Sequence, residues 1–218
     1  MRMTAELSNT ELFKGLDKAQ IEAMLPCLGI RQISYEQGDQ IICVGTRLSE
    51  VGILVEGKAT ISHTNSRGEV TVLKTLHPGD LFGEEYICAG VPDSPITVTA
   101  DTESTVLFLH FNHLLTGCAN ACPFHSMTIH NLIKILAKRT IIQEQKIEVL
   151  TKRTTREKLL VYLEMLQEEQ GSEIIEVPIN RGKLADYLSV DRSAMSREIG
   201  KLCSEGVIEC DHNRFRIL

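Results

Sequence analysis

Four side chains able to hydrogen-bond with nucleic-acid bases lie close together between residues 192 and 197. They are Arg192, Ser193, Ser196 and Arg197, and on a helix this spacing places them on one face. An arginine can donate two parallel hydrogen bonds to O6 and N7 of guanine, and a serine hydroxyl can reach a base or a phosphate. The spacing therefore predicts a helix that reads base edges in DNA. The plainer alternative is a helical hairpin with a solvated Arg/Ser face.

The surrounding segment has the pattern of two short helices joined by a tight turn at residues 189–190. Asn180 is a suitable N-cap for the first helix, and Asp191 for the second. Lys201 and Arg181 are better placed for phosphates than for bases. The pattern predicts a helix-turn-helix. The residues expected to face its core are Leu184, Ala185, Leu188, Ala194, Met195, Ile199 and Leu202.

An arginine-rich β-hairpin is expected directly after these helices. The runs Ile208–Cys210 and Arg214–Ile217 alternate apolar and polar residues on either side of a turn. Residues 151–218 are thus predicted to form a winged helix-turn-helix. They carry 11 basic and 12 acidic residues, against 12 and 17 in residues 1–150, so most of the net charge of −6 lies outside this segment. Because DNA affinity depends on locally placed cations, the acidic total does not exclude DNA as a partner.

Residues 30–109 are typical of an all-β region. Turn signals such as Glu56-Gly57 and Pro78-Gly79-Asp80 separate short apolar runs, and ten of the 15 glycines fall in the first 90 residues. Short helical patterns precede this region at residues 5–29. We predict an α+β chain with a β-barrel or β-sandwich near its start. The six expected strands are Ile30–Tyr35, Val51–Val55, Lys58–His63, Val70–Leu76, Ile96–Ala100 and Thr105–Leu109.

A long helix is predicted over residues 123–150, with heptad spacing of its apolar positions. A second apolar set, Leu132, Ile135 and Ile142, lies on a flanking face. A helix that is apolar on two faces must contact two surfaces, so we predict a homodimer seam on one side and the β-domain on the other. A single buried helix in a monomer is the alternative. The seam positions are Ile129, Ile133, Leu136, Thr140, Gln143 and Ile147.

Three motifs, taken in this order, give the chain a family resemblance: GDQIICVGTRLSEVGILVEG at residues 38–57, PGDLFGE at residues 78–84 and SVDRSAMSRE at residues 189–198. Over nearly its whole length the chain resembles CRP/FNR transcription regulators. The resemblance implies a double-stranded β-helix of jelly-roll type as sensor (1–120), a dimerisation helix (121–150) and a winged helix-turn-helix (151–218). It also implies a homodimer on pseudo-palindromic double-stranded DNA, a small-molecule effector that shifts the population of DNA-binding conformations, and contact with RNA polymerase.

The effector expected for the β-roll is not a cyclic nucleotide. In cyclic-AMP-binding members the Glu of the PGDLFGE-like motif meets the ribose, and an Arg about ten residues later meets the phosphate. Here Gly83-Glu84 is present, but Ser94-Pro95 occupies the Arg position, and no Lys or Arg lies between Lys74 and Lys134. A buried phosphate without a cation would be poorly compensated, which favours a neutral or weakly acidic molecule. The expected lining is Phe82, Gly83, Glu84, Tyr86, Ile87, Val98, Leu132 and Ile135.

Cysteine and histidine leave one alternative open. Cys118, Cys122 and His125 have a spacing that could hold a metal, position a haem ligand or act as redox thiols, although they could equally be small side chains packed at a helix start. We therefore assign no metal site, but keep haem or thiol sensing as the alternative function. Cys27 and Cys43 are too far apart for the cysteine cluster of an iron–sulfur sensor.

The remaining patterns exclude other classes of protein. No nucleophile elbow, phosphate-binding loop, HExxH or paired-carboxylate signature is present, so we expect no enzyme. The chain has no apolar run long enough to cross a membrane and no signal-peptide pattern at its start, so we expect a cytoplasmic protein. In FNR-type members a Glu precedes the Ser-Arg pair; Ser193 replaces it here, so the half-site should differ at that base.

Overall fold

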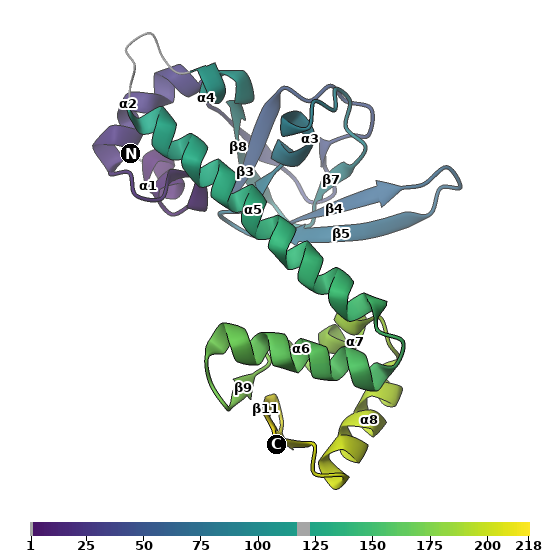
Figure 1. Cartoon of the computed structure of the whole chain (residues 1–218). Coiled ribbons are helices and arrows are strands. Elements are labelled where there is room, and N and C mark those ends of the chain that lie inside the picture. Colours follow the sequence, from purple (N-terminus) through teal and green to yellow (C-terminus); the bar gives the residue numbers. More distant parts are fainter. Residues whose placement is uncertain (1, 117–122) are drawn as a thin grey trace. The chain divides into compact units, whose positions relative to one another are not determined.

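The computed structural model describes residues 2–116 and 123–218 and confirms the α+β class (Figure 1). The chain forms two compact units, divided between Ala137 and Lys138. The elements of the first unit that precede the long helix are α1 (Arg2–Ser8), η1 (Glu11–Phe13), α2 (Lys18–Leu28), β1 (Arg31–Tyr35), β2 (Gln40–Ile42), β3 (Glu50–Glu56), β4 (Ala59–Thr64), β5 (Val70–Leu76), β6 (Leu81–Phe82), α3 (Glu84–Cys88), β7 (Thr97–Ala100), β8 (Ser104–His110) and α4 (Phe111–Thr116).

The strands build two four-stranded antiparallel sheets, in the orders β1-β8-β3-β6 and β2-β7-β4-β5. All six runs predicted from the sequence are strands, each within one residue of its expected bounds. Strand β8 lies between β1 and β3 and is buried along all but its last residue, as expected for a strand covered on both faces. This arrangement confirms the predicted β-roll.

Two apolar clusters stabilise the first unit. One joins residues of both sheets and includes Leu54, Phe82, Val98 and Val106. The other packs the N-terminal helices against the start of the long helix, and includes Leu132 and Ile135. Burial of such side chains contributes about 1.5–3 kcal/mol each.

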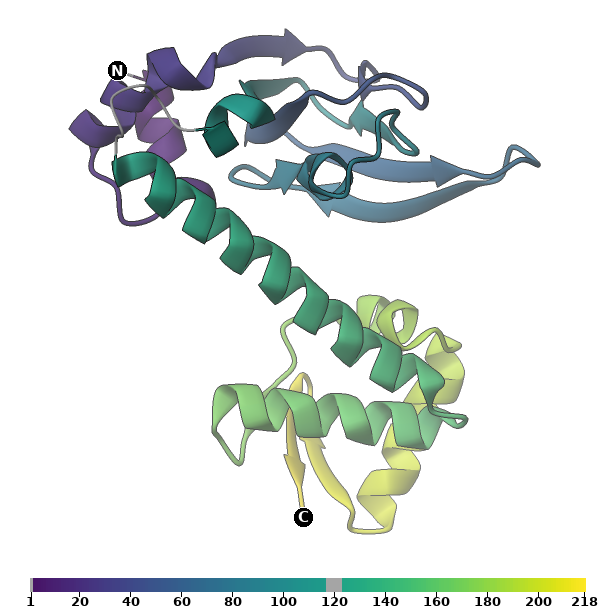
Figure 2. The same ribbon diagram turned by 45° about the horizontal axis from the view of Figure 1, so that its top comes forward.

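The predicted long helix is confirmed as α5 (Pro123–Thr151), which Figure 2 shows as one unbroken helix. In its first half the Asn131 amide donates to the backbone oxygens of Leu12 (3.0 Å) and Lys14 (2.8 Å), which anchors α5 to the N-terminal helices. Among the helices within the described residues, none is both long and apolar enough to cross a membrane.

The second unit contains the predicted helix-turn-helix and wing. Its elements after α5 are α6 (Thr155–Gln170), β9 (Ile175–Glu176), α7 (Arg181–Leu188), α8 (Arg192–Ser204), β10 (Ile208–Asp211) and β11 (Arg214–Ile217). The wing strands pair antiparallel, and β9 adds a third strand that the sequence pattern did not predict. The three helices and the wing enclose one core, with Leu163, Leu188, Leu202 and Phe215 buried at its centre.

Candidate nucleic-acid interface

Side-chain caps and a strained turn set the geometry of the helix-turn-helix. The Asn180 side chain accepts from Lys183 N at the start of α7, and the Asp191 side chain accepts from Ala194 N (2.8 Å) at the start of α8. Between the helices Ser189 adopts a left-handed conformation with φ of 51°, which ends α7 and allows the chain to reverse. Both N-caps predicted from the sequence are confirmed.

Helix α8 has a buried face and an exposed face, as its pattern predicted. Met195, Ile199 and Leu202 are buried in the core of the second unit. The exposed residues include the four candidate base readers Arg192, Ser193, Ser196 and Arg197, together with Lys201. Cationic and hydroxyl groups therefore gather on the solvent side of α8, toward its N-terminal end, where a recognition helix meets base edges.

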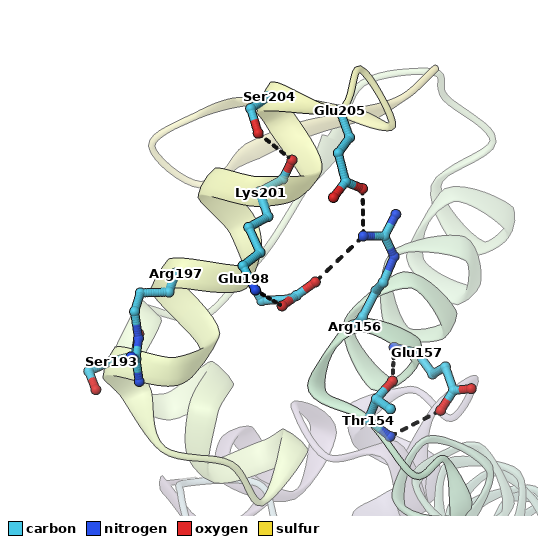
Figure 3. Close-up of polar contacts among 9 residues, drawn as sticks. All are labelled: Thr154, Arg156, Glu157, Ser193, Arg197, Glu198, Lys201, Ser204 and Glu205. Carbon is cyan, nitrogen blue, oxygen red and sulfur yellow. Dashed lines mark hydrogen bonds and ion pairs between the residues drawn. The ribbon is translucent and has the colours of Figure 1, made fainter.

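The conformation of the candidate reader Arg197 leaves its guanidinium accessible. Its Nε donates a long hydrogen bond of 3.4 Å to the backbone oxygen of Ser193, one turn earlier. In Figure 3 both residues lie on the side of α8 away from Arg156. A weak contact of this kind costs little to break when a base offers a better acceptor.

Arg156 on helix α6 forms ion pairs with the candidate recognition helix α8. Its Nη1 lies 2.6 Å from Glu205 Oε2 and 3.7 Å from Glu198 Oε1, which links α6 to the end of α8 (Figure 3). Lys158 donates to the backbone oxygen of Leu188 (3.0 Å), which ties α6 to α7. The sequence did not predict the roles of these two residues, because a contact between distant helices follows no spacing rule.

The predicted phosphate contact Arg181 is engaged inside its own domain. Its Nη2 donates to Cys210 Sγ (3.0 Å) and to the backbone oxygen of His212, and its guanidinium stacks over the ring of Phe215 at 4.6 Å. Its Nη1 is buried and has no hydrogen-bond partner. In this structure Arg181 therefore connects the start of α7 to the wing.

Comparison with known proteins gives the family. Residues 32–120 match the cyclic nucleotide-binding domain, and residues 157–218 match the Crp-like helix-turn-helix domain. The chain is 26% identical over 200 residues to the transcriptional activator protein FnrL of Cereibacter sphaeroides, covering 85% of this chain and 75% of the relative. It is 25% identical over 203 residues to the cyclic AMP receptor protein of Thermus thermophilus, covering 93% and 89%. The chain belongs to the CRP/FNR family of transcription regulators.

Solved structures support the same fold. The catabolite activator protein of Thermus thermophilus superposes with a TM-score of 0.56 at 22% identity, covering 96% of this chain and 94% of the other. The protein DNR of Pseudomonas aeruginosa gives a TM-score of 0.53 at 22% identity, covering 99% and 93%. These structures show the shared fold. The helix-turn-helix model and the curated relatives show a CRP/FNR-type regulator with a DNA-binding helix-turn-helix, and the members of this family are transcription regulators.

The sensor residues predicted to line the effector pocket divide between the two apolar clusters of the first unit. Phe82 and Val98 belong to the cluster that joins the sheets, with Tyr86 packed against it. Leu132 and Ile135 belong to the cluster on the N-terminal helices, with Ile87 packed against it. The eight residues thus do not share one cluster, and which of them meet an effector stays a prediction.

The motif residues Gly83 and Glu84 lie at the start of α3. Gly83 is its N-cap residue, with φ of 85°, and Glu84 is fully buried. Burial, followed by the nearby charge of Glu85, raises the pKa of Tyr86, so its hydroxyl stays a neutral hydrogen-bonding group.

The candidate metal or haem residues are only partly described. Cys118 and Cys122 lie outside the described residues. His125 is 3% exposed, and neither ring nitrogen has a hydrogen-bond partner. Within residues 2–116 and 123–218, no group of three or more His, Cys, Asp or Glu side chains could hold a metal ion.

The cap of the recognition helix gives a pH-dependent prediction. The hydroxyl of Ser193 and then the backbone N–H of Ala194 hold the pKa of Asp191 below its ordinary value. A carboxyl with a lowered pKa in the folded state stabilises that state above its unfolded pKa, and this contribution is lost as pH falls through the folded pKa. Asp191→Ala should therefore lower the melting temperature at pH 7, with a deficit that shrinks below about pH 4.

The matched control for this cap is Asp191→Asn, since asparagine is an equally good N-cap without an ionisable group. Circular dichroism melts at pH 7 and pH 3 distinguish the variants. Asp191→Asn should remain close to the wild type at pH 7. A deficit of Asp191→Ala that is equal at both pH values would show that the carboxylate does not stabilise α8.

Proposed function

We propose that the protein is a homodimeric regulator that reads a pseudo-palindromic DNA site, gated by a small molecule other than a cyclic nucleotide. The observation that carries the proposal is the exposed face of α8, with Arg192, Ser193, Ser196 and Arg197 on one capped helix. The regulator would act on DNA in the bacterial cytoplasm, with RNA polymerase as a further partner. Its role would be binding rather than catalysis.

Exposed apolar residues on α5 support the homodimer. Ile133 and Ile147, both predicted seam positions, are each 59% exposed in the single chain. They are two heptads apart and therefore lie on one face of the helix, so a second copy of α5 could cover both. Large apolar side chains left in water along a helix are typical of an interaction surface.

Introducing a charge on the seam should produce monomers. Ile133→Glu and Ile147→Glu each place two carboxylates at the centre of the symmetric contact, where desolvation and repulsion oppose association. We expect half the mass of the wild type in light scattering and loss of binding to a two-half-site DNA. Gln145→Glu, which adds the same charge off the seam, should stay dimeric. A monomeric wild type would contradict the seam.

The sensor chemistry supports an effector without a phosphate. Between Lys74 and Lys134 the chain supplies no Lys or Arg, whereas it buries the carboxylate of Glu84 completely. A phosphate buried in this region without a cation would be poorly compensated. A neutral or weakly acidic molecule that donates a hydrogen bond fits this surrounding better.

In vitro selection of DNA tests the proposal. The purified protein is offered random DNA alone and with cyclic AMP, haem, peroxide or a panel of small aromatic molecules. We expect enrichment of a palindrome with guanine in each half-site, sharpened by one of the aromatic molecules. Sharpening by cyclic AMP would overturn the effector argument, and enrichment of no sequence under any condition would overturn the DNA-reading argument.

A haem- or thiol-based sensor is the second candidate. The observation that favours it is His125, which is buried without a hydrogen-bond partner on either nitrogen and is therefore able to bind a metal. A haem absorbance band that appears in the wild type and is lost in His125→Leu would favour this candidate. A wild type that gives no band on haem addition would exclude haem.

A further inference from the structure

A small cavity lies between the start of α7 and the wing, entirely within the second unit. It has a volume of about 390 Å³, which is in the range of small-ligand pockets. Its apolar walls come from Val177, Ile179, Leu184 and Phe215. The polar residues that line it are Asn180, Arg181, His212 and Asn213.

The charge in this cavity is positive and uncompensated. Arg181 is the one residue of the lining with a permanent charge, and the lining contains no Asp or Glu. Among the described residues Arg181 contacts a ring, a thiol and a backbone oxygen but forms no ion pair, and its buried Nη1 has no acceptor. A buried guanidinium nitrogen without an acceptor is costly, so an anion supplied from outside would be stabilised there.

We propose that this cavity binds a small organic acid with an apolar body. The carboxylate would pair with the guanidinium of Arg181, which lines the cavity, and the hydrocarbon part would pack on Leu184 and Phe215. Both halves of the site are needed, since a bare phosphate would leave the apolar walls in water and an uncharged hydrocarbon would leave Nη1 without an acceptor.

The site would couple the acid to DNA binding, a step that rests on the proposed function. In the DNA complex Arg181 is the predicted phosphate contact at the start of α7. An acid bound to Arg181 would hold the guanidinium against the wing and compete with the phosphate. By linkage, the acid should weaken DNA binding by the same factor by which DNA weakens binding of the acid.

Ligand-observed NMR on the full-length protein tests the site directly. The probes are benzoate, its uncharged analogue benzyl alcohol, and inorganic phosphate. We expect benzoate to bind at least about tenfold more tightly than benzyl alcohol, because a hydrogen bond to a charged group is at stake. Benzoate should also lower the affinity for the selected DNA site.

Two variants locate the binding and exclude the sensor unit as its source. Arg181→Met keeps the length and apolar body of the side chain but removes the charge. Asn180→Asp keeps the N-cap of α7 and places a carboxylate in the lining, so it remains informative if Arg181→Met unfolds. Both should lose benzoate binding.

The outcomes separate this inference from the proposed function. Benzoate that binds both variants as well as the wild type, or that does not bind the wild type, overturns the acid site, whatever the DNA result. Phosphate binding that exceeds benzoate binding also overturns it, and identifies the cavity as a DNA-backbone contact. A wild type that binds benzoate but selects no DNA keeps the acid site and contradicts the regulator.

Discussion

Arg197→Ala is expected to abolish the preference for guanine at one position of each half-site. It should also weaken binding by about 1–3 kcal/mol per half-site, roughly 5- to 150-fold. The guanidinium is exposed on α8, where it donates a 3.4 Å hydrogen bond to the backbone oxygen of Ser193 and lies near the charge of Asp191. Its loss should therefore change the free protein little, so the loss of affinity reports the base contact. Selection of DNA by the variant, followed by binding curves on the wild-type site, measures both effects.

Lys201→Ala is the matched control for that substitution. Lys201 is exposed near the end of α8, with its ammonium 3.9 Å from Glu198 Oε2, and it is predicted to contact a phosphate rather than a base. Its loss should weaken binding about equally on all sequences and reduce the salt dependence by about one phosphate contact. Guanine enrichment that survives Arg197→Ala would show that another side chain reads this base.

The local features of the DNA-binding unit could be predicted because their causes are local. Asn180 and Asp191 cap helices whatever surrounds them, since each accepts from a backbone N–H three residues later. The period of the apolar residues on α8 likewise follows from helix geometry alone. These signals placed the four candidate readers on one exposed face before any tertiary contact was considered.

Features that depend on distant parts of the chain could not be predicted. Strands β6 and β9 are two residues long, too short to show an alternation of apolar and polar residues. They are recognised as strands only because they pair with β3 and β11. An arginine at the start of a helix is suited to contact a phosphate. Whether the Arg181 guanidinium lies in solvent or packs on the wing depends, however, on Phe215 and Cys210, about 30 residues later. The division of Leu132 and Phe82 between two clusters has the same origin.

Gly52→Ala is expected to destabilise the sensor unit by about 1–3 kcal/mol through overpacking. Gly52 on β3 pairs with Phe82 on β6, and a Cβ added at Gly52 would lie 2.2 Å from Cζ of the Phe82 ring. The ring is fully buried and packs edge-on against Phe108 at 6.4 Å, so it cannot move aside without disturbing the cluster between the sheets. Scanning calorimetry would record the lower melting temperature of the sensor unit.

The double variant Gly52→Ala/Phe82→Leu distinguishes this contact from a general intolerance of alanine in β3. Leucine is shorter than phenylalanine, so it should relieve the clash, and the double variant should be more stable than the sum of the two single effects predicts. Gly200→Ala makes the same chemical change on α8, where nothing lies within 4 Å of the added Cβ, and should be neutral or stabilising. If the Gly52→Ala variant has the same melting temperature as the wild type, the Phe82 ring moves freely. It would then be available to an effector as a pocket wall rather than fixed as part of the core.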